Sequence, residues 1–343
     1  MSSTSPSITP SVTERLIGAI DLTRGLQLAG IAAVLGLLIA APYVVNVFIV
    51  GLLALALVNG LFAMSIDLMA GYAGLVTLGH AGVLASAMYG AGYVADKADG
   101  PFWLQLLVGL AVGLGMSAIF GLMAMRSSGV YFIMVTIAQG MIIWGLSIRL
   151  NSITGAENGL LGIRRPEAIA PNWIYYYLVL AVVTICSVML FVVVRSPFGL
   201  SLRGLRESEV RVRMLGHNSA LLKFYLFMVS GFFATVAGLL LLYLNEFVNP
   251  TDAILASSAI PVLMAILGGL GTMVGAMIGA FIITFIQNFV SLYVERWPIL
   301  MGALFVFVML FARDGIVGTF SRWWYRTIQN GRSPPERLVG ADT

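Results

Sequence analysis

Long apolar runs separated by short polar breaks make up most of this 343-residue chain. Hydrophobic residues account for 59% of the sequence and charged residues for only 10%, whereas about a quarter of the residues in a soluble domain are charged. A helix needs about 20 mainly apolar residues to cross roughly 30 Å of hydrocarbon. Composition and run length therefore exclude a soluble globular fold and predict an all-α, polytopic membrane protein.

Polar breaks and Gly/Pro punctuation divide the apolar part into about ten predicted transmembrane helices. The eighth is short and is followed by a GGLG turn, so a partial or re-entrant helix is the alternative there, and nine or eight spans stay open. We expect a transmembrane domain over 26–313, a lead-in over 1–25 and a tail over 314–343. The predicted helices cover 26–42, 46–69, 74–95, 102–125, 129–149, 173–195, 219–244, 253–268, 272–294 and 297–313.

The distribution of Lys and Arg sets the orientation of these helices. Fourteen of the nineteen lie in the lead-in, at Arg126, in a central charged stretch with Lys223, and in the tail. By the positive-inside rule, these parts and both termini are cytoplasmic, and the loop 150–172 is external. A cleaved signal peptide is the competing interpretation of the N-terminus, but Glu14 and Asp21 make a poor n-region.

The central charged stretch, 195–217, lies between two strongly apolar runs. Ser196 and Pro197 are typical of a helix start, and Gly216 suits the left-handed residue that ends a helix. The stretch predicts a short cytoplasmic helix that docks on a partner, and a solvated inter-helix loop is the alternative.

Side-chain spacing supports a helix in this stretch. Acid-before-base pairs four residues apart stabilise an exposed helix by about 0.2–0.5 kcal/mol each. A narrow apolar stripe adds a face for contact. The pairs are Glu207 with Arg211 and Glu209 with Arg213, and the stripe is Leu202, Leu205, Val212 and Leu215.

Polar residues are sparse in the predicted spans, and no charge lies near a midpoint. Ion-coupled carriers usually need an acid, a base or an ion cage there, so the energy for any transport must enter elsewhere. The candidate pathway residues are Asn59, Asp67, His80, Thr136 and Gln139. For His80 two hypotheses stand: a structural hydrogen bond to a carbonyl or to Asp67, or a role in the cytoplasmic gate of a pathway.

Small residues recur at every fourth position on three predicted helices, which favours close packing between helix backbones. We interpret them as packing residues. They are Gly82, Ser86 and Gly90; Gly109, Gly113, Ser117 and Gly121; and Gly271, Gly275 and Gly279.

Catalytic chemistry has little support in the sequence. Cys186 is the only cysteine, and the two histidines, His80 and His217, lie far apart without a carboxylate cluster. No GxxxxGK[ST] loop is present, so this chain is not expected to hydrolyse ATP. We therefore predict no catalytic, cofactor-binding or metal-binding residues, and no enzyme.

Several stretches together resemble a known family, the LivM-like permease subunits of branched-chain amino-acid ABC importers. The most specific is GYAGLVTLGHAG, Gly71 to Gly82, with its Gly-rich segment and Leu-Gly-His triplet. The central stretch RGLRESEVRVRMLG is similar to the EAA-type loop of that family. The other matching stretches are SSGVYFIMVTIAQG, TGAENGLLGI, GGLGTMVGAMIGA and FARDGIVG.

The resemblance implies a coupling helix over about Leu202 to Leu215 that sits in a cleft of an ATPase. The sequence departs from the family pattern at 210–213, where Val-Arg-Val-Arg replaces small alanines and an acid. The candidate coupling residues are Arg203, Arg206, Glu207, Glu209, Arg211 and Gly216.

The resemblance also implies a multi-pass permease of a bacterial inner membrane. Its expected partners are two cytoplasmic ABC ATPase subunits, a second homologous permease subunit and an external substrate-binding protein. Branched-chain or other hydrophobic amino acids are the expected substrates, and urea, short amides or aromatic acids are the alternatives. A channel or a secondary carrier is the competing class of function.

Overall fold

The computed structural model describes residues 35–293 and seven positions beyond them: 299, 302, 303, 306, 315, 316 and 318. Within these residues every regular element is a helix, and the only β contact is one isolated bridge between Leu160 and Val248. The all-α prediction is therefore confirmed. The lead-in, the tail and nearly all of the tenth predicted span lie outside the described residues.

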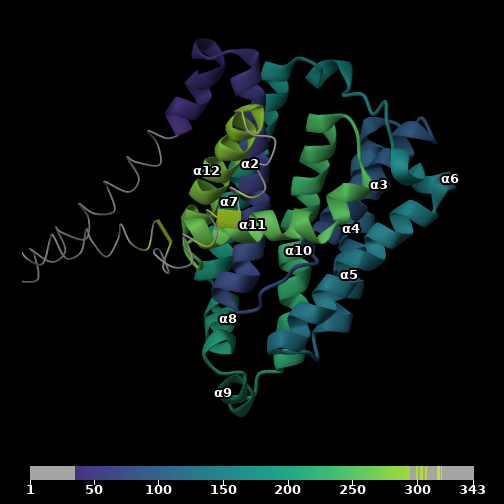
Figure 1. The fold of residues 1–343 in the computed structure, drawn as a ribbon. Coiled ribbons are helices and arrows are strands. Elements are labelled where there is room, and N and C mark those ends of the chain that lie inside the picture. The colour runs from purple at the N-terminus through teal and green to yellow at the C-terminus, as the bar shows by residue number, and fades with distance from the viewer. Residues whose placement is uncertain are drawn as a thin grey trace, which may run out of the picture. The chain divides into compact units, whose positions relative to one another are not determined.

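Two units divide the chain, Met1–Val50 and Gly51–Thr343. The first contributes the short apolar helix Leu35–Val44 and the beginning of α2. The second contains every other described helix (Figure 1).

Six helices among the described residues are long and apolar enough to cross a membrane. Ten spans are therefore not supported by this part of the chain. The predicted third and eighth spans form shorter helices, and the first is described only from Leu35 onward. The six are α2 (Val47–Asp67) with its π-helical end η1 (Leu68–Tyr72), α4 (Phe102–Ala124), α5 (Gly129–Arg149), α7 (Asn172–Arg195), α10 (Ser219–Asn245) and α12 (Val274–Tyr293).

Helix α3 (His80–Asp96) begins six residues later than the predicted span, which started at residue 74. Gly74 takes a left-handed φ of +71°, and the residues up to Gly79 make no regular helix. Their amides bind other groups: Leu78 N donates to Thr136 Oγ1 at 3.2 Å. The Gly-rich segment thus delays the helix, since glycine adopts this conformation without steric cost.

Most of α3 is buried, and it packs against both α4 and α10. Its small residues permit this close packing, as predicted. A Cβ on Gly109 of α4 would lie 2.5 Å from Leu239 Cδ2 and 2.9 Å from the carbonyl oxygen of Ala87. The absence of a side chain at Gly109 lets α3, α4 and α10 approach one another closely at this point.

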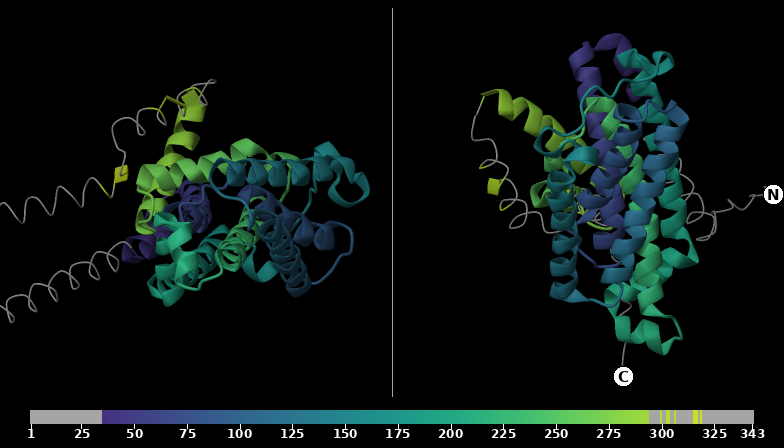
Figure 2. Two further views of the ribbon diagram at one scale, coloured as in Figure 1. Left: turned by 90° about the horizontal axis from the view of Figure 1, so that it is seen from below. Right: turned by 90° about the vertical axis from the view of Figure 1, so that its right-hand side faces the viewer.

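Helix α11 (Leu255–Gly268) has 14 residues, about 21 Å at 1.5 Å per residue, which is too short to span a bilayer. It follows the short helix η4 (Pro250–Ala253) and is followed by the GGLG turn, where Gly269 and Gly271 have positive φ. Figures 1 and 2 show α11 lying across the long helices instead of along them. This length favours the alternative of a partial or re-entrant helix in the eighth segment.

The loop between α5 and α7 is fixed to the end of α10 by Arg165. Its Nε donates to the Tyr243 carbonyl at 2.6 Å, and its Nη2 donates to the Leu244 carbonyl at 3.0 Å. The guanidinium also lies 4.4 Å from the ring centre of Tyr175. The cation therefore satisfies the last carbonyls of α10, which a helix leaves free. The loop contains α6 (Asn151–Thr154), η2 (Ala156–Asn158) and η3 (Glu167–Ile169).

Candidate coupling segment and polar residues of the bundle

The charged stretch forms two helices, α8 (Pro197–Glu207) and α9 (Glu209–Met214), at the end of the bundle where α10 begins (Figure 1). The prediction of one continuous helix over 202–215 is therefore wrong. Ser208 interrupts it with extended backbone angles, φ −166° and ψ 109°, and its side chain caps α9 by accepting from the Arg211 amide. Serine favours such cap positions because its hydroxyl competes for backbone groups.

The predicted ends of the stretch are confirmed. Ser196 is the N-cap of α8 with Pro197 in its first turn, and Gly216 has a left-handed φ of +86°. Both predicted ion pairs form, at 3.7 Å for Glu207 with Arg211 and 2.6 Å for Glu209 with Arg213. These are the local features that sequence spacing specifies.

The apolar stripe is only partly correct. Leu202, Leu205 and Val212 are buried, but Leu215 is 78% exposed. Because α9 ends at Met214, Leu215 lies outside the helix and leaves the stripe.

Helix α8 is fixed to the end of α2. Arg206 Nη1 donates to the carbonyl oxygen of Gly71 in η1, and the Arg203 guanidinium lies 5.4 Å from the ring centre of Tyr72. Arg203 and Arg206, two of the predicted coupling residues, are exposed, but each directs its guanidinium to η1.

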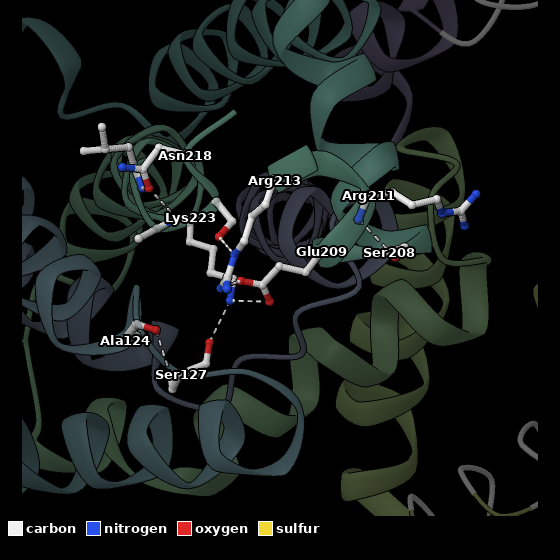
Figure 3. Close-up of polar contacts among 11 residues, drawn as sticks. Ala124, Ser127, Ser208, Glu209, Arg211, Arg213, Asn218 and Lys223 are labelled. Atoms are coloured by element: carbon white, nitrogen blue, oxygen red, sulfur yellow. Dashed lines mark hydrogen bonds and ion pairs between the residues drawn. The ribbon is translucent and has the colours of Figure 1, made fainter. Parts of the chain in front are cut away.

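Helix α9 is fixed instead to α10 and to the turn between α4 and α5 (Figure 3). Glu209 accepts from Lys223 Nζ at 3.0 Å, and the same ammonium donates to the Ser127 carbonyl at 2.9 Å. Arg213 Nε donates to Ser219 Oγ at 2.8 Å. Burial raises the pKa of the Glu209 carboxyl, but hydrogen bonds from Lys223, Ser219 and Arg213 outweigh it and hold that pKa below its usual range.

A solvent-facing side of the segment remains available. The side chains of Glu207 and Arg211 are 71% and 68% exposed. Val210, Met214 and Leu215 are exposed beside them. Nothing lies within 4 Å of a Cβ built on Gly216. These residues form an apolar patch flanked by charges, which we call the α9 face.

The five candidate pathway residues do not form one cluster. Asn59 Nδ2 donates to Thr284 Oγ1 of α12 at 3.1 Å, and Asp67 accepts from the amides of Gly271 and Met273 at 2.7 and 3.1 Å. Asn59 and Asp67 therefore fasten α2 to α12 and to the turn before it.

Thr136 and Gln139 of α5 lie elsewhere, where α5 packs against α3. Gly79, the residue directly before His80, packs against the Thr136 backbone so closely that a Cβ there would overlap the Thr136 carbonyl oxygen. Gln139 Nε2 donates to the Phe120 carbonyl of α4 at 3.0 Å. Both side chains are fully buried. Thr136 contacts the residues before α3 and Gln139 contacts α4, so these contacts are separate from those of Asn59 and Asp67.

His80 is also fully buried, but its hydrogen bond is not to Asp67. Its Nε2 lies 2.7 Å from Ser230 Oγ of α10, and Ser230 Oγ donates to the Ser65 carbonyl at 2.6 Å. Because a hydroxyl has one hydrogen, Ser230 accepts from a protonated Nε2. The partner is therefore neither a carbonyl nor Asp67, as the structural hypothesis proposed, but a hydroxyl on α10.

Sequence reasoning did not assign Lys223 or Ser230 to a site. The sequence assigns Lys223 only as a cytoplasmic charge, although its position five residues into an apolar helix is a usable signal. Ser230 carries no such signal, because its role depends on packing of α2, α3 and α10. Among the described residues, no group of three or more His, Cys, Asp or Glu side chains is placed to hold a metal ion.

Long apolar helices, a buried small-residue core and a charged segment beyond the spans define a multi-pass membrane protein. Comparison with known proteins specifies it further. Residues 48–312 match the family model described as "Branched-chain amino acid transport system / permease component", and the chain belongs to this family.

Two similar proteins are each named "High-affinity branched-chain amino acid transport system permease protein LivM". They come from Escherichia coli (strain K12) and Salmonella typhimurium (strain LT2). Each is 25% identical to this chain over 331 residues, covering 88% of this chain and 77% of the relative. No solved structure matches the chain.

Proposed function

We propose that this chain is the permease subunit of an ATP-driven importer of branched-chain or other hydrophobic amino acids. The observation that carries the proposal is the α8–α9 segment, a pair of charged helices fixed to the bundle on one side and exposed on the other. Exposed apolar residues beside an exposed ion pair suit a protein partner. The partner in this proposal is a pair of cytoplasmic ABC ATPases.

The polar groups of the bundle support this choice over a secondary carrier. Asp67 and Lys223 are the charged residues buried in the described helices, and each is near a helix end with its own partners. Ion-coupled carriers place such groups at the middle of the membrane. An external energy source acting through α8–α9 fits this arrangement.

The full assembly in this proposal has a second homologous permease subunit and an external substrate-binding protein, in a bacterial inner membrane with both termini cytoplasmic. The substrate assignment rests on the family and on the names of the two relatives. The uncharged buried side chains of Thr136 and Gln139 on α5 suit a zwitterion with an apolar side chain.

Vesicles holding the complete complex test the proposal. They are supplied in turn with leucine, isoleucine, valine, urea, acetamide and benzoate, with and without ATP on the cytoplasmic side. We expect ATP-dependent accumulation of the three amino acids. ATP-dependent uptake of urea, acetamide or benzoate, without uptake of the amino acids, would contradict the proposed substrate class. Uptake at the same rate with and without ATP would contradict the ATP-driven mechanism.

A further inference from the structure

Lys223 is the buried lysine of this chain. Its side chain is 2% exposed, whereas Lys97, the only other lysine in the sequence, is 47% exposed beside Asp96. Burying an ammonium is costly unless it is paired and hydrogen-bonded. Lys223 meets that condition by binding Glu209 of α9 and the Ser127 carbonyl. One ammonium therefore joins α9, α10 and the α4–α5 turn (Figure 3).

Along α10, further contacts continue from Lys223 toward the middle of the bundle. One turn on, the Phe227 ring lies 5.9 Å from that of His80, and the Phe227 carbonyl accepts from Ser117 of α4. Two turns on, Ser230 contacts His80. Seven residues of helix span about 10 Å. A single rigid stretch of α10 therefore connects Glu209 to the first residue of α3.

Helix α8, the other half of the segment, contacts a different part of the bundle from α9. α8 is fixed to η1 through Arg206 and Arg203, and Ser208 separates it from α9 with extended backbone. A break of this kind absorbs a change in angle between two short helices without disturbing either. A displacement of α9 can thus reach α10 while α8 stays with α2.

We propose that Lys223 is the positioning residue that transmits movement of α9 along α10 to His80, with Ser208 as the hinge between the moving and the fixed half of the segment. This inference rests on the proposed function, because it requires an ATPase to move α9. It assigns Glu209 to transmission, and the exposed pair Glu207 and Arg211 to docking.

The test uses the complete complex in vesicles, purified through a tag on this chain, and Lys223→Met as the main variant. Methionine keeps the buried stem, and Glu209 keeps its 2.6 Å bond to Arg213, so no buried charge is left alone. Lys97→Met is the matched control. Lys223→Gln, which can still donate to both oxygen atoms, is the conservative variant.

Three quantities are measured: the ATPase that co-purifies, the rate of ATP hydrolysis, and leucine taken up per ATP hydrolysed. We expect Lys223→Met to retain the ATPase but to lower leucine per ATP by about tenfold, the factor that a loss of one charged hydrogen bond corresponds to. Lys223→Gln should recover part of the ratio, and Lys97→Met should match the unmodified protein. Glu209→Gln combined with Lys223→Met should lower the ratio no further.

An unchanged ratio in Lys223→Met overturns the inference, as does a double variant with additive losses. Loss of the ATPase from Lys223→Met would assign Lys223 to docking and also overturn it. If Lys223→Met does not assemble, Lys223→Gln and Glu209→Gln decide by the same ratio. Failure of the proposed function is distinct, because the unmodified complex would then carry no ATPase or show no ATP-dependent uptake.

Discussion

The α3–α4–α10 core and the α8–α9 segment are held in place by opposite means. In the core, helices approach because side chains are missing, as at Gly109 against Leu239. In the segment, a few long side chains reach back to the bundle, as Arg206 does to Gly71 and Glu209 to Lys223. The first kind of contact is made by many atoms at once, and the second by single directional bonds.

This difference indicates how each region responds to force. Close-packed cores deform little, because any displacement produces overlap or a void. Hydrogen-bonded ion pairs can break and reform at a cost of a few kcal/mol or less. We therefore expect the core to move as one body and the segment to rearrange relative to it. The predictions below test this contrast in order of expected effect.

The largest effect should come from filling a core contact. Gly109→Leu places a side chain against Leu239 and the Ala87 carbonyl, and overpacking of this kind costs about 1–3 kcal/mol or more. Gly115 lies on the same helix with nothing within 4 Å of its Cβ, so Gly115→Leu is the control. Thermal unfolding in detergent should show a lower midpoint for the first variant only. Equal midpoints would mean that α4 is not close-packed at Gly109.

Strain at the end of the segment should come next. Gly216 has a left-handed φ of +86°, which a β-branched residue adopts at a cost of about 1–2 kcal/mol. Gly216→Val should therefore reduce ATPase co-purification while the bundle keeps its thermal midpoint, and Gly216→Asn should be milder because asparagine tolerates this conformation. Normal co-purification by Gly216→Val would favour a solvated connection without a docking role.

A smaller effect is expected at the contact between α10 and α3. His80→Ala and Ser230→Ala each remove the same hydrogen bond, worth about 1 kcal/mol, so each should lower the thermal midpoint slightly. The two losses should not add when combined. Under the gate hypothesis both variants also lower leucine uptake per ATP hydrolysed. If His80→Ala leaves midpoint and uptake unchanged, neither hypothesis for His80 holds.

Sequence patterns predicted the local features of this protein well. Ser196, Pro197 and Gly216 occupy their expected positions, because caps depend on the backbone angles of a few consecutive residues. The apolar runs likewise predicted most long helices, since membrane thickness sets their length. The family resemblance was confirmed over 48–312.

Features that depend on distant neighbours were not predicted correctly. The break at Ser208 forms where α8 and α9 bind different parts of the bundle, and no residue nearby specifies both partners. The late start of α3 depends partly on Thr136, which lies 58 residues away from Leu78 in the chain. His80 was expected to bond a carbonyl or Asp67, but packing of α10 against α3 gives it the Ser230 hydroxyl instead. The roles of the candidate pathway residues stay predictions.

The central claim is that the α9 face is cytoplasmic and binds an ATPase, and thiol labelling tests it most directly. In a Cys186→Ser background, single cysteines are placed at Met214, 81% exposed on the α9 face, and at Leu161, 62% exposed in the α5–α7 loop. An impermeant thiol reagent should label position 161 in intact cells. It should label position 214 only in opened membranes, with less labelling when the ATPase partner is co-expressed. Labelling of position 214 in intact cells would contradict the claim. So would labelling of position 214 in opened membranes that is the same with and without the co-expressed ATPase.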